Sequence, residues 1–296
     1  MSAATVKAVG TAAEAPAPRP VSPARGLFRA MIRLHQSAVW FWGLLVVLTA
    51  GALLWAAGPG VDAAWAEYVK SGCLETDYCE VGPAYNKYET AVTFGTFVLS
   101  LAPELIGAWA GAALIARELE TGTARLAWTQ SVGPVRWLAA KLAVPAALIV
   151  SGTLLLTLLN RLVWWSEADL RRALNTRDWF DTATFTAHGT AATAHALLGL
   201  AIGVCAGLLL RRSLPALAVG LLGTALATST LVSYRGSMWP AETLVVRTTE
   251  PDFIDLHPSS HYWPLQLVET GIALALAAVL VLLSFRLLRR HTGGTR

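Results

Sequence analysis

The sequence is poor in charged residues. They make up 14% of its 296 residues, whereas a soluble domain carries about 25%. The charges fall in clusters separated by long apolar runs, and 55% of the chain is hydrophobic. Segments without a polar face cannot be exposed to water, so this pattern argues against a soluble domain and predicts a membrane protein. The net charge of +4 does not indicate nucleic-acid binding, because the basic residues lie beside the apolar runs.

Lysine is also scarce, and the common catalytic motifs do not occur. A P-loop ends in Gly-Lys-Ser/Thr, but none of the four lysines follows a glycine: Lys7, Lys70, Lys87 and Lys141. Neither a Gly-x-Ser-x-Gly elbow nor a His-Glu-x-x-His zinc motif occurs. We therefore expect a chain that is not an enzyme and has no cofactor of its own, so that any ATP would be bound by a partner subunit.

Cysteine occurs only three times. Cys205 lies inside an apolar run and is expected to be a small buried residue. Cys73 and Cys79 share one predicted external loop. They could form a local disulfide in an oxidising compartment, although spacing alone does not show that the geometry is met.

Histidines that could bind a metal occur near the end of the chain. His257 and His261 are four residues apart, which is the spacing of two ligands on one helical face. Pro251 and Pro258 argue against a regular helix here. We therefore expect an exposed loop and no metal site.

Six apolar windows have the length of about 20 residues that crosses a hydrocarbon core. Backbone groups in lipid must be satisfied within the segment, so each window is predicted to be a helix and the fold an all-α polytopic membrane protein. The windows are approximately 38–57, 91–116, 142–163, 188–210, 214–233 and 265–285. Residues 1–24, rich in Ala and Pro, are predicted to be a disordered cytosolic tail, 25–290 the transmembrane domain and 291–296 a second tail.

The distribution of Lys and Arg predicts the orientation. Of the 23 basic residues, 15 lie on the side that holds both termini and the connections after the second and fourth windows. The basic side is cytosolic by the positive-inside rule. The opposite loops hold ten of the acidic residues, including Glu167, Asp178 and Asp255. We expect a multi-pass plasma-membrane protein with both termini in the cytosol.

A basic amphipathic segment precedes the first window. Arg25, Arg29 and Arg33 recur every four residues, with apolar residues over much of the remaining surface. This pattern is typical of an interfacial helix lying among lipid headgroups. A simple basic flank that only sets the topology is the alternative.

Ionisable residues inside the apolar windows are candidates for function, because a charge in hydrocarbon is costly. They are Glu104, Arg161, His195 and Glu269. Glu104 follows Pro103 and could face the bundle interior or a permeation path. It could equally be a structural partner of Arg161 or His195, or an interfacial acid.

Small residues form a stripe along the fourth window. Gly199, Gly203 and Gly207 recur every four residues and would allow a second helix to approach closely. That helix could belong to this chain or to a second copy.

The connection between the second and third windows is the most informative segment. It begins with acids, breaks at Gly122, continues with Leu126 and Trp128 among polar residues, and breaks again at Gly133-Pro134. Exposed apolar residues among charges are suited to docking another protein. Packing against the chain's own helices or the headgroups is the alternative.

The run Arg117-Glu118-x-Glu120-x-Gly122-Thr123, followed by Leu126, Ser131, Arg136 and Lys141, resembles the first cytosolic loop of type-2 ABC transporter permeases, particularly actinobacterial forms. The resemblance extends from about Arg25 to Arg290. It implies that this loop is a coupling helix that binds a separate ATPase, with contact residues Glu118, Glu120, Gly122, Thr123, Arg125, Leu126 and Trp128. The Ala/Pro tail and the Pro- and His-rich loop from Tyr234 to Pro264, where the family has re-entrant helices, depart from the pattern.

The resemblance implies the membrane subunit of an ABC exporter for a small amphiphilic or drug-like molecule. Its partners would be a cytosolic ABC ATPase, the lipid bilayer and a second permease, in a homodimer or a heterodimer. The alternative is a membrane sensor, immunity or assembly protein that transports nothing. An intramembrane enzyme is disfavoured because paired nucleophile and base motifs are lacking.

Overall fold

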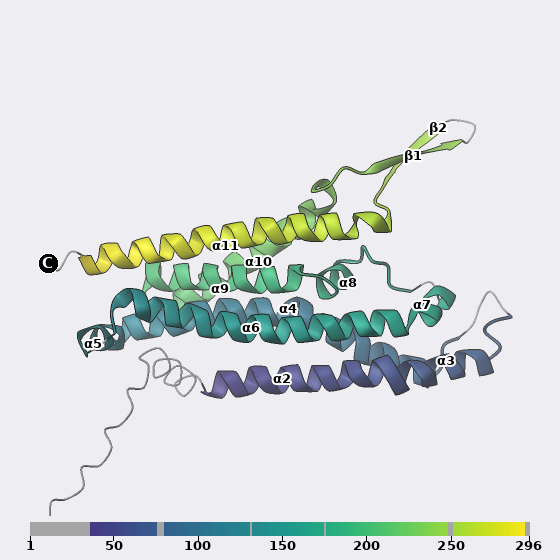
Figure 1. Ribbon diagram of the computed structural model, residues 1–296, viewed down its shortest axis with the longest axis horizontal. Coiled ribbons are helices and arrows are strands. Elements are labelled where there is room, and N and C mark those ends of the chain that lie inside the picture. The colour runs from purple at the N-terminus through teal and green to yellow at the C-terminus, as the bar shows by residue number, and fades with distance from the viewer. Residues whose placement is uncertain (1–35, 76–79, 131, 175, 248–250, 294–296) are drawn as a thin grey trace, which may run out of the picture.

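Six long helices lie side by side in the computed structural model (Figure 1). The structure describes residues 36–75, 80–130, 132–174, 176–247 and 251–293. Each of the six helices is long and apolar enough to cross a membrane. The predicted fold class, an all-α polytopic membrane protein, is confirmed.

Five of the six helices extend beyond the predicted apolar windows, whereas α9 begins three residues after the predicted start at 188. The first span is α2 (Gln36–Trp55), continued through a π-helical turn (Ala56–Gly60) into α3 (Val61–Lys70). The other spans are α4 (Pro83–Glu120), α6 (Pro134–Ser166), α9 (Ala191–Leu210), α10 (Ser213–Tyr234) and α11 (Tyr262–Gly293). Shorter helices connect them: α5 (Thr123–Gln130), α7 (Ala168–Leu174) and α8 (Thr182–Ala187). Because turns rich in polar residues can continue a helix past the hydrocarbon, apolar windows underestimate helix length.

Helix α9 occupies the centre of the bundle and packs against α4, α6, α10 and α11. Two thirds of its apolar segment is buried, against about a quarter for α10. Outer helices instead expose large apolar side chains, such as Trp40 on α2, Leu222 on α10 and Leu282 on α11. In water such a surface would be unfavourable, whereas hydrocarbon chains cover it without penalty.

Helices α4 and α9 touch backbone to backbone. A Cβ atom at Gly111 of α4 would overlap the carbonyl of Leu200, and one at Gly203 of α9 would overlap the carbonyl of Ala108. Small residues permit this approach because no side chain separates the two backbones. The glycine stripe on α9 therefore packs within this chain, and a matching pair on α4, Gly107 and Gly111, completes the contact.

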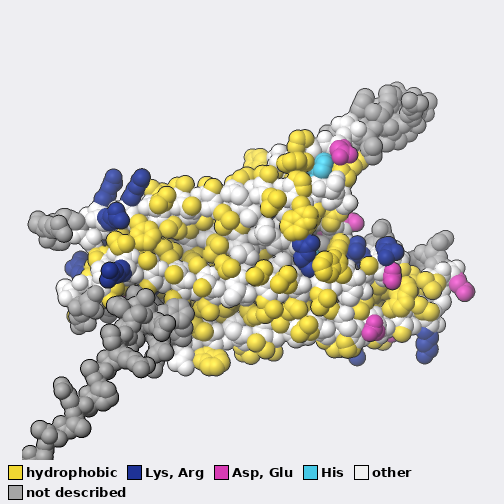
Figure 2. Space-filling view, viewed as in Figure 1, with side chains coloured by type: hydrophobic (Ala, Val, Ile, Leu, Met, Phe, Trp, Pro, Cys, Tyr) yellow, Lys and Arg dark blue, Asp and Glu magenta, His cyan; other side chains and the backbone are white. Residues whose placement is uncertain are grey.

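The bundle has two chemically different ends (Figures 1 and 2). The basic end carries α5 and the last turns of α11, and the visible face there shows Lys and Arg without acidic side chains. The hairpin end carries α3, α7 and the strands β1 (Glu242–Arg247) and β2 (Pro251–Leu256), with acids and bases intermixed. The strands pair antiparallel, with Leu244 opposite Ile254.

The segment 234–264 contains two short 3-10 turns (Arg235–Ser237 and Ser259–His261) and the hairpin of β1 and β2. No re-entrant helix lies in its described residues. Pro240, Pro251 and Pro258 disfavour helix in this region. The predicted tail 1–24 and the interfacial helix with Arg25, Arg29 and Arg33 lie outside the described residues.

Candidate functional site

The loop at the basic end is a sharp turn between two helices. Helix α4 ends at Glu120 and α5 starts at Thr123, and Gly122 between them has φ +75°. This left-handed conformation is costly for residues with a Cβ but not for glycine. Gly122 therefore terminates α4 and redirects the chain into α5.

Glu118 fixes the loop to the start of α6. Its carboxylate accepts hydrogen bonds from Trp137 Nε1 at 2.8 Å and from Lys141 Nζ at 2.5 Å. Lys141 is 3% exposed, so its charge is compensated in a largely dry environment. Glu118 thus lies on the inner side of the loop, where it holds α4 and α6 together.

Glu120 connects the same loop to α10. Its Oε2 accepts a hydrogen bond from the backbone N–H of Ser213 at 2.9 Å and another from the Ser213 hydroxyl. Ser213 is the first residue of α10, so Glu120 satisfies a free N–H at the positive end of that helix. The two acids thus tie the end of α4, from which the chain turns into α5, to two other spans.

The predicted coupling residues fall on two sides of α5. Thr123, Arg125 and Leu126 are exposed, and Leu126 leaves 59% of its surface free. Trp128 is turned inward and packs edge to face on Trp137, with ring centroids 5.6 Å apart. The face available to another molecule is therefore Arg125 and Leu126, which we call the α5 face.

A second group of polar side chains lies inside the bundle near the hairpin end. His195 of α9 stands between two acids: its Nδ1 is 3.3 Å from Glu104 Oε1 and its Nε2 is 2.9 Å from Glu269 Oε1. Arg235 holds Glu269 from the other side, with Nε 2.6 Å and Nη2 2.9 Å from the two carboxylate oxygens. We call these four residues the buried polar cluster.

The cluster is almost fully dry. Glu269 is 0% and His195 1% exposed. Each ring nitrogen of His195 lies within 3.3 Å of a carboxylate oxygen, so a protonated imidazole would interact with both acids. Two carboxylates, that imidazolium and the Arg235 guanidinium would together carry no net charge.

Glu104 and His195 also line a cleft of about 390 Å³. Its walls come from α4, α8, α9 and α10, and hydroxyl groups are frequent among them: Ser100, Thr182, Thr186, Thr224, Thr228 and Ser229. A polar stripe in an otherwise apolar cleft can hydrogen-bond a ligand while the remaining wall contacts its apolar part.

The structure brings together three of the four predicted intramembrane residues. Arg161 is separate: it donates to the carbonyl of His188 at 3.3 Å and stacks on Trp263. The sequence reading missed Arg235, which it counted among the residues of the external loop. The sequence offers little indication that Arg235 is buried, because it directly follows an apolar window. Its inward position depends on how α10 packs against α9.

A third ionic group ties the loop after α7 to the bundle. Glu167 accepts a hydrogen bond from Arg177 Nη2 at 2.6 Å and another from the hydroxyl of Tyr88. Burial raises the pKa of the Glu167 carboxyl, and the Arg177 guanidinium opposes that rise. Arg177 has φ +53°, and its ion pairs with Glu167 and Glu89 hold this strained backbone in place.

The cysteines and the two histidines near the end of the chain are the remaining candidates. Cys73 is buried and disulfide-bonded, and Cys205 is a free thiol. Cys79 lies outside the described residues, so its pairing with Cys73 stays a prediction. His257 and His261 are 3.2 Å apart at their Nδ1 atoms, and no group of three metal-ligand side chains occurs among the described residues.

Comparison with known families gives one match. The model of a family described as ABC-2 membrane transporter related matches residues 43–235. This range contains four of the six spans and most of the first, the loop with α5, and all members of the buried polar cluster except Glu269. Comparison with curated proteins and with solved structures finds no match.

Proposed function

Because this chain belongs to the family of ABC-2 membrane transporter related proteins, we propose that it exports a small amphiphilic or drug-like molecule with energy from a separate ATPase. The family and the six-helix fold make it a membrane transporter permease. Such a permease supplies the path and is not the enzyme, so ATP would be bound and hydrolysed by the partner.

The observation that carries the ATPase-coupling proposal is the α5 face. Leu126 is an exposed apolar side chain beside the exposed cation Arg125, on a short helix that follows the end of α4. Glu118 and Glu120 tie that end of α4 to α6 and α10, and Trp128 of α5 packs on Trp137 of α6. A rigid apolar knob with a charged neighbour has the features of a hot spot in a protein interface. Anchoring to α4, α6 and α10 provides a route by which a push on α5 would move three spans.

The charge distribution supports a cytosolic basic end. Of the 23 basic residues, 15 belong to segments predicted on that side, nine of them among the described residues, whereas acids gather at the hairpin end. This asymmetry favours a plasma-membrane orientation with both termini and α5 in the cytosol. An ATPase could then reach the α5 face from the compartment that holds ATP.

The buried polar cluster and its cleft are the proposed part of the transport path. Charged groups held in hydrocarbon mark substrate and ion pathways more often than they serve packing alone. Glu104 contributes to both the cluster and the cleft wall. We propose that two permeases, identical or related, together form the path.

The test is affinity purification of the full chain from its native membrane, followed by mass spectrometry of co-purifying proteins. We expect a P-loop ATPase to be enriched with the wild-type chain. Leu126→Asp should reduce its recovery at least tenfold, since removing an interface anchor typically costs 2 kcal/mol or more.

Leu74→Asp is the matched control, because Leu74 is equally exposed, at 60%, but lies at the hairpin end. It should leave recovery of the ATPase unchanged. If no P-loop protein is enriched, or if both variants retain it equally, the coupling proposal is wrong.

A further inference from the structure

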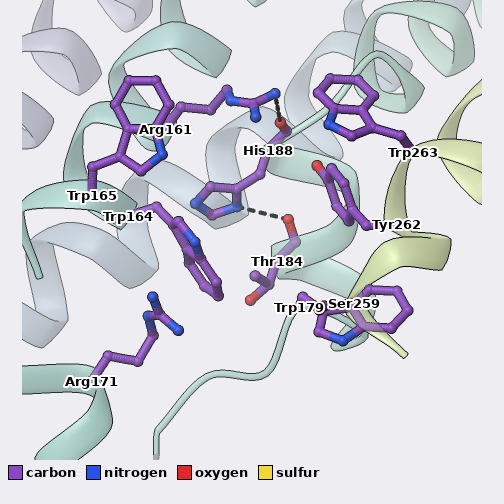
Figure 3. Close-up of a pocket in the computed structure, with 10 residues that line it drawn as sticks. All are labelled: Arg161, Trp164, Trp165, Arg171, Trp179, Thr184, His188, Ser259, Tyr262 and Trp263. Atoms are coloured by element: carbon purple, nitrogen blue, oxygen red, sulfur yellow. Dashed lines mark hydrogen bonds between the residues drawn. The ribbon is translucent and has the colours of Figure 1, made fainter. Parts of the chain in front are cut away.

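A separate pocket of about 340 Å³ opens at the hairpin end (Figure 3). It lies between the last turns of α6, the connections through α7 and α8, and the start of α11. None of the residues of the buried polar cluster lines it. Its size is at the lower end of the range for small-ligand sites.

The pocket is walled by aromatic rings. Four of the 12 tryptophans of the chain line it, together with one tyrosine: Trp164, Trp165, Trp179, Trp263 and Tyr262. Tryptophan is favoured at the edge of a bilayer, where one side of the ring meets hydrocarbon and the other meets headgroups. Scattered rings would suffice for anchoring, whereas these converge on one cavity from three segments of the chain (Figure 3).

Two guanidinium groups face the same cavity. Arg161 lies 4.8 Å from the ring centroid of Trp263, and Arg171 lies 3.7 Å from that of Trp164. Stacking occupies the faces of a guanidinium and leaves its N–H edges for hydrogen bonds to an anion. The aromatic rings thus hold both cations in place without using up their donors.

The positive charge of the pocket is incompletely compensated. Arg161 makes no ion pair among the described residues, and its Nη1 donates only to the carbonyl of His188. The carboxylate nearest to Arg171 is Glu167 at 3.9 Å, which Arg177 already binds at 2.6 Å. The Arg171 Nε has no hydrogen-bond partner among the residues that the structure describes. Among the described residues that line the pocket, none is acidic.

We propose that this pocket binds an anionic amphiphile, with a phosphate or carboxylate head between Arg161 and Arg171 and an apolar chain against the indole rings. Guanidinium edges bind such heads through charge-assisted hydrogen bonds. The position at the ends of the spans places the head at headgroup depth. The ligand is either a lipid of the bilayer or a free amphiphile that enters from solution. The site does not depend on the coupling of the chain to an ATPase.

The test uses the full chain in phosphatidylcholine nanodiscs and reads tryptophan fluorescence during titration with octyl phosphate. Octyl glucoside, which has the same chain and a neutral head, and inorganic phosphate, which has no chain, are the comparison probes. We expect octyl phosphate to bind at least tenfold more tightly than either. Equal binding of octyl glucoside, or no saturable binding of octyl phosphate, would overturn the proposal.

Variants locate the site. Arg161→Gln and Arg171→Gln should each weaken octyl phosphate binding about tenfold, the effect of one charge-assisted hydrogen bond. Arg172→Gln is the matched control, since Arg172 also lies on α7 but is 72% exposed and pairs with Asp169. It should change the affinity less than twofold. Arg161→Lys and Arg171→Lys keep the charge and should retain the preference for octyl phosphate over octyl glucoside. This comparison shows whether a glutamine variant binds weakly because it lacks the cation or because the chain is misfolded. If both glutamine variants bind as wild type does, the site is not here.

Nanodiscs that contain phosphatidylglycerol distinguish the two sources. If a bilayer lipid is the ligand, the anionic lipid should fill the pocket and suppress the octyl phosphate signal in wild type. If the ligand comes from solution, the signal should persist at the same affinity. Either result supports the anionic site, provided that the glutamine variants lose it in phosphatidylcholine.

Discussion

Arg235 offers a direct test of the buried polar cluster, because it is the guanidinium that faces Glu269. Glu269 is fully buried, and the two N–O contacts with Arg235 measure 2.6 and 2.9 Å. Removing one partner of a buried ion pair leaves an uncompensated charge and typically costs about 3–5 kcal/mol. We expect Arg235→Gln to lower the free energy of unfolding by this amount.

The paired change should be much milder. Arg235→Met together with Glu269→Met removes both charges and replaces them with apolar chains of similar length, which is often neutral or even stabilising. His195 keeps Glu104 as a partner in that variant. The double variant should therefore be at least 2 kcal/mol more stable than Arg235→Gln, an interaction energy typical of residues in contact.

The assay is reversible unfolding of the purified chain in mixed detergent, followed by circular dichroism. Arg172→Gln is the surface control: its pair with Asp169 is exposed on both sides, and its loss should cost less than about 1 kcal/mol. If Arg235→Gln is as stable as wild type, or if the double variant is less stable than the single one, then the cluster is not a compensated ionic unit and the reasoning fails.

Two further predictions concern packing and pH. Gly203→Ala should lower the free energy of unfolding by about 1–3 kcal/mol, because its Cβ would overlap the backbone carbonyl of Ala108. Gly51→Ala is the control: its Cβ meets open space, so the change should be neutral or stabilising by up to about 1 kcal/mol. Unfolding measurements that give equal effects for the two variants would contradict the tight contact of α4 and α9. Burial lowers the pKa of His188 from 6.5 to about 4, so the unfolded chain binds more protons between these values, and the free energy of unfolding should fall as the pH drops from 6.5 to 4, by up to about 3 kcal/mol. His188→Gln should lose that part of the pH slope, and an unchanged slope would show that His188 is not buried in its neutral form.

Local features of the sequence were enough for the fold class and for much of the loop. An apolar stretch of about 20 residues must form a helix in lipid whatever surrounds it, so the number of spans follows from length and composition. Gly122 likewise carries its own information, since its left-handed backbone is a property of glycine. The family resemblance rested on this same loop, and the match over residues 43–235 confirms it.

The sequence did not show which buried side chains contact one another. Glu104 had two candidate partners in the sequence, Arg161 and His195, and only the packing of α4 on α9 places it beside His195. Arg235 looked like an exposed loop residue until the end of α10 turned it toward Glu269. Glu118 and Trp128 looked like surface residues, and the packing of α5 against α6 turned them inward.

The difference between what the sequence and the tertiary structure each determine has a physical cause. Solvation by the bilayer acts on each segment separately, so hydrophobic length and basic flanks specify the spans and favour an orientation one segment at a time. Many ion pairs and backbone approaches join residues far apart in the sequence, such as Arg235 and Glu269, 34 positions apart, or His195 and Glu104. The sequence alone therefore determined that this chain spans a membrane six times, and only the tertiary structure decided which of its few charges meet inside it.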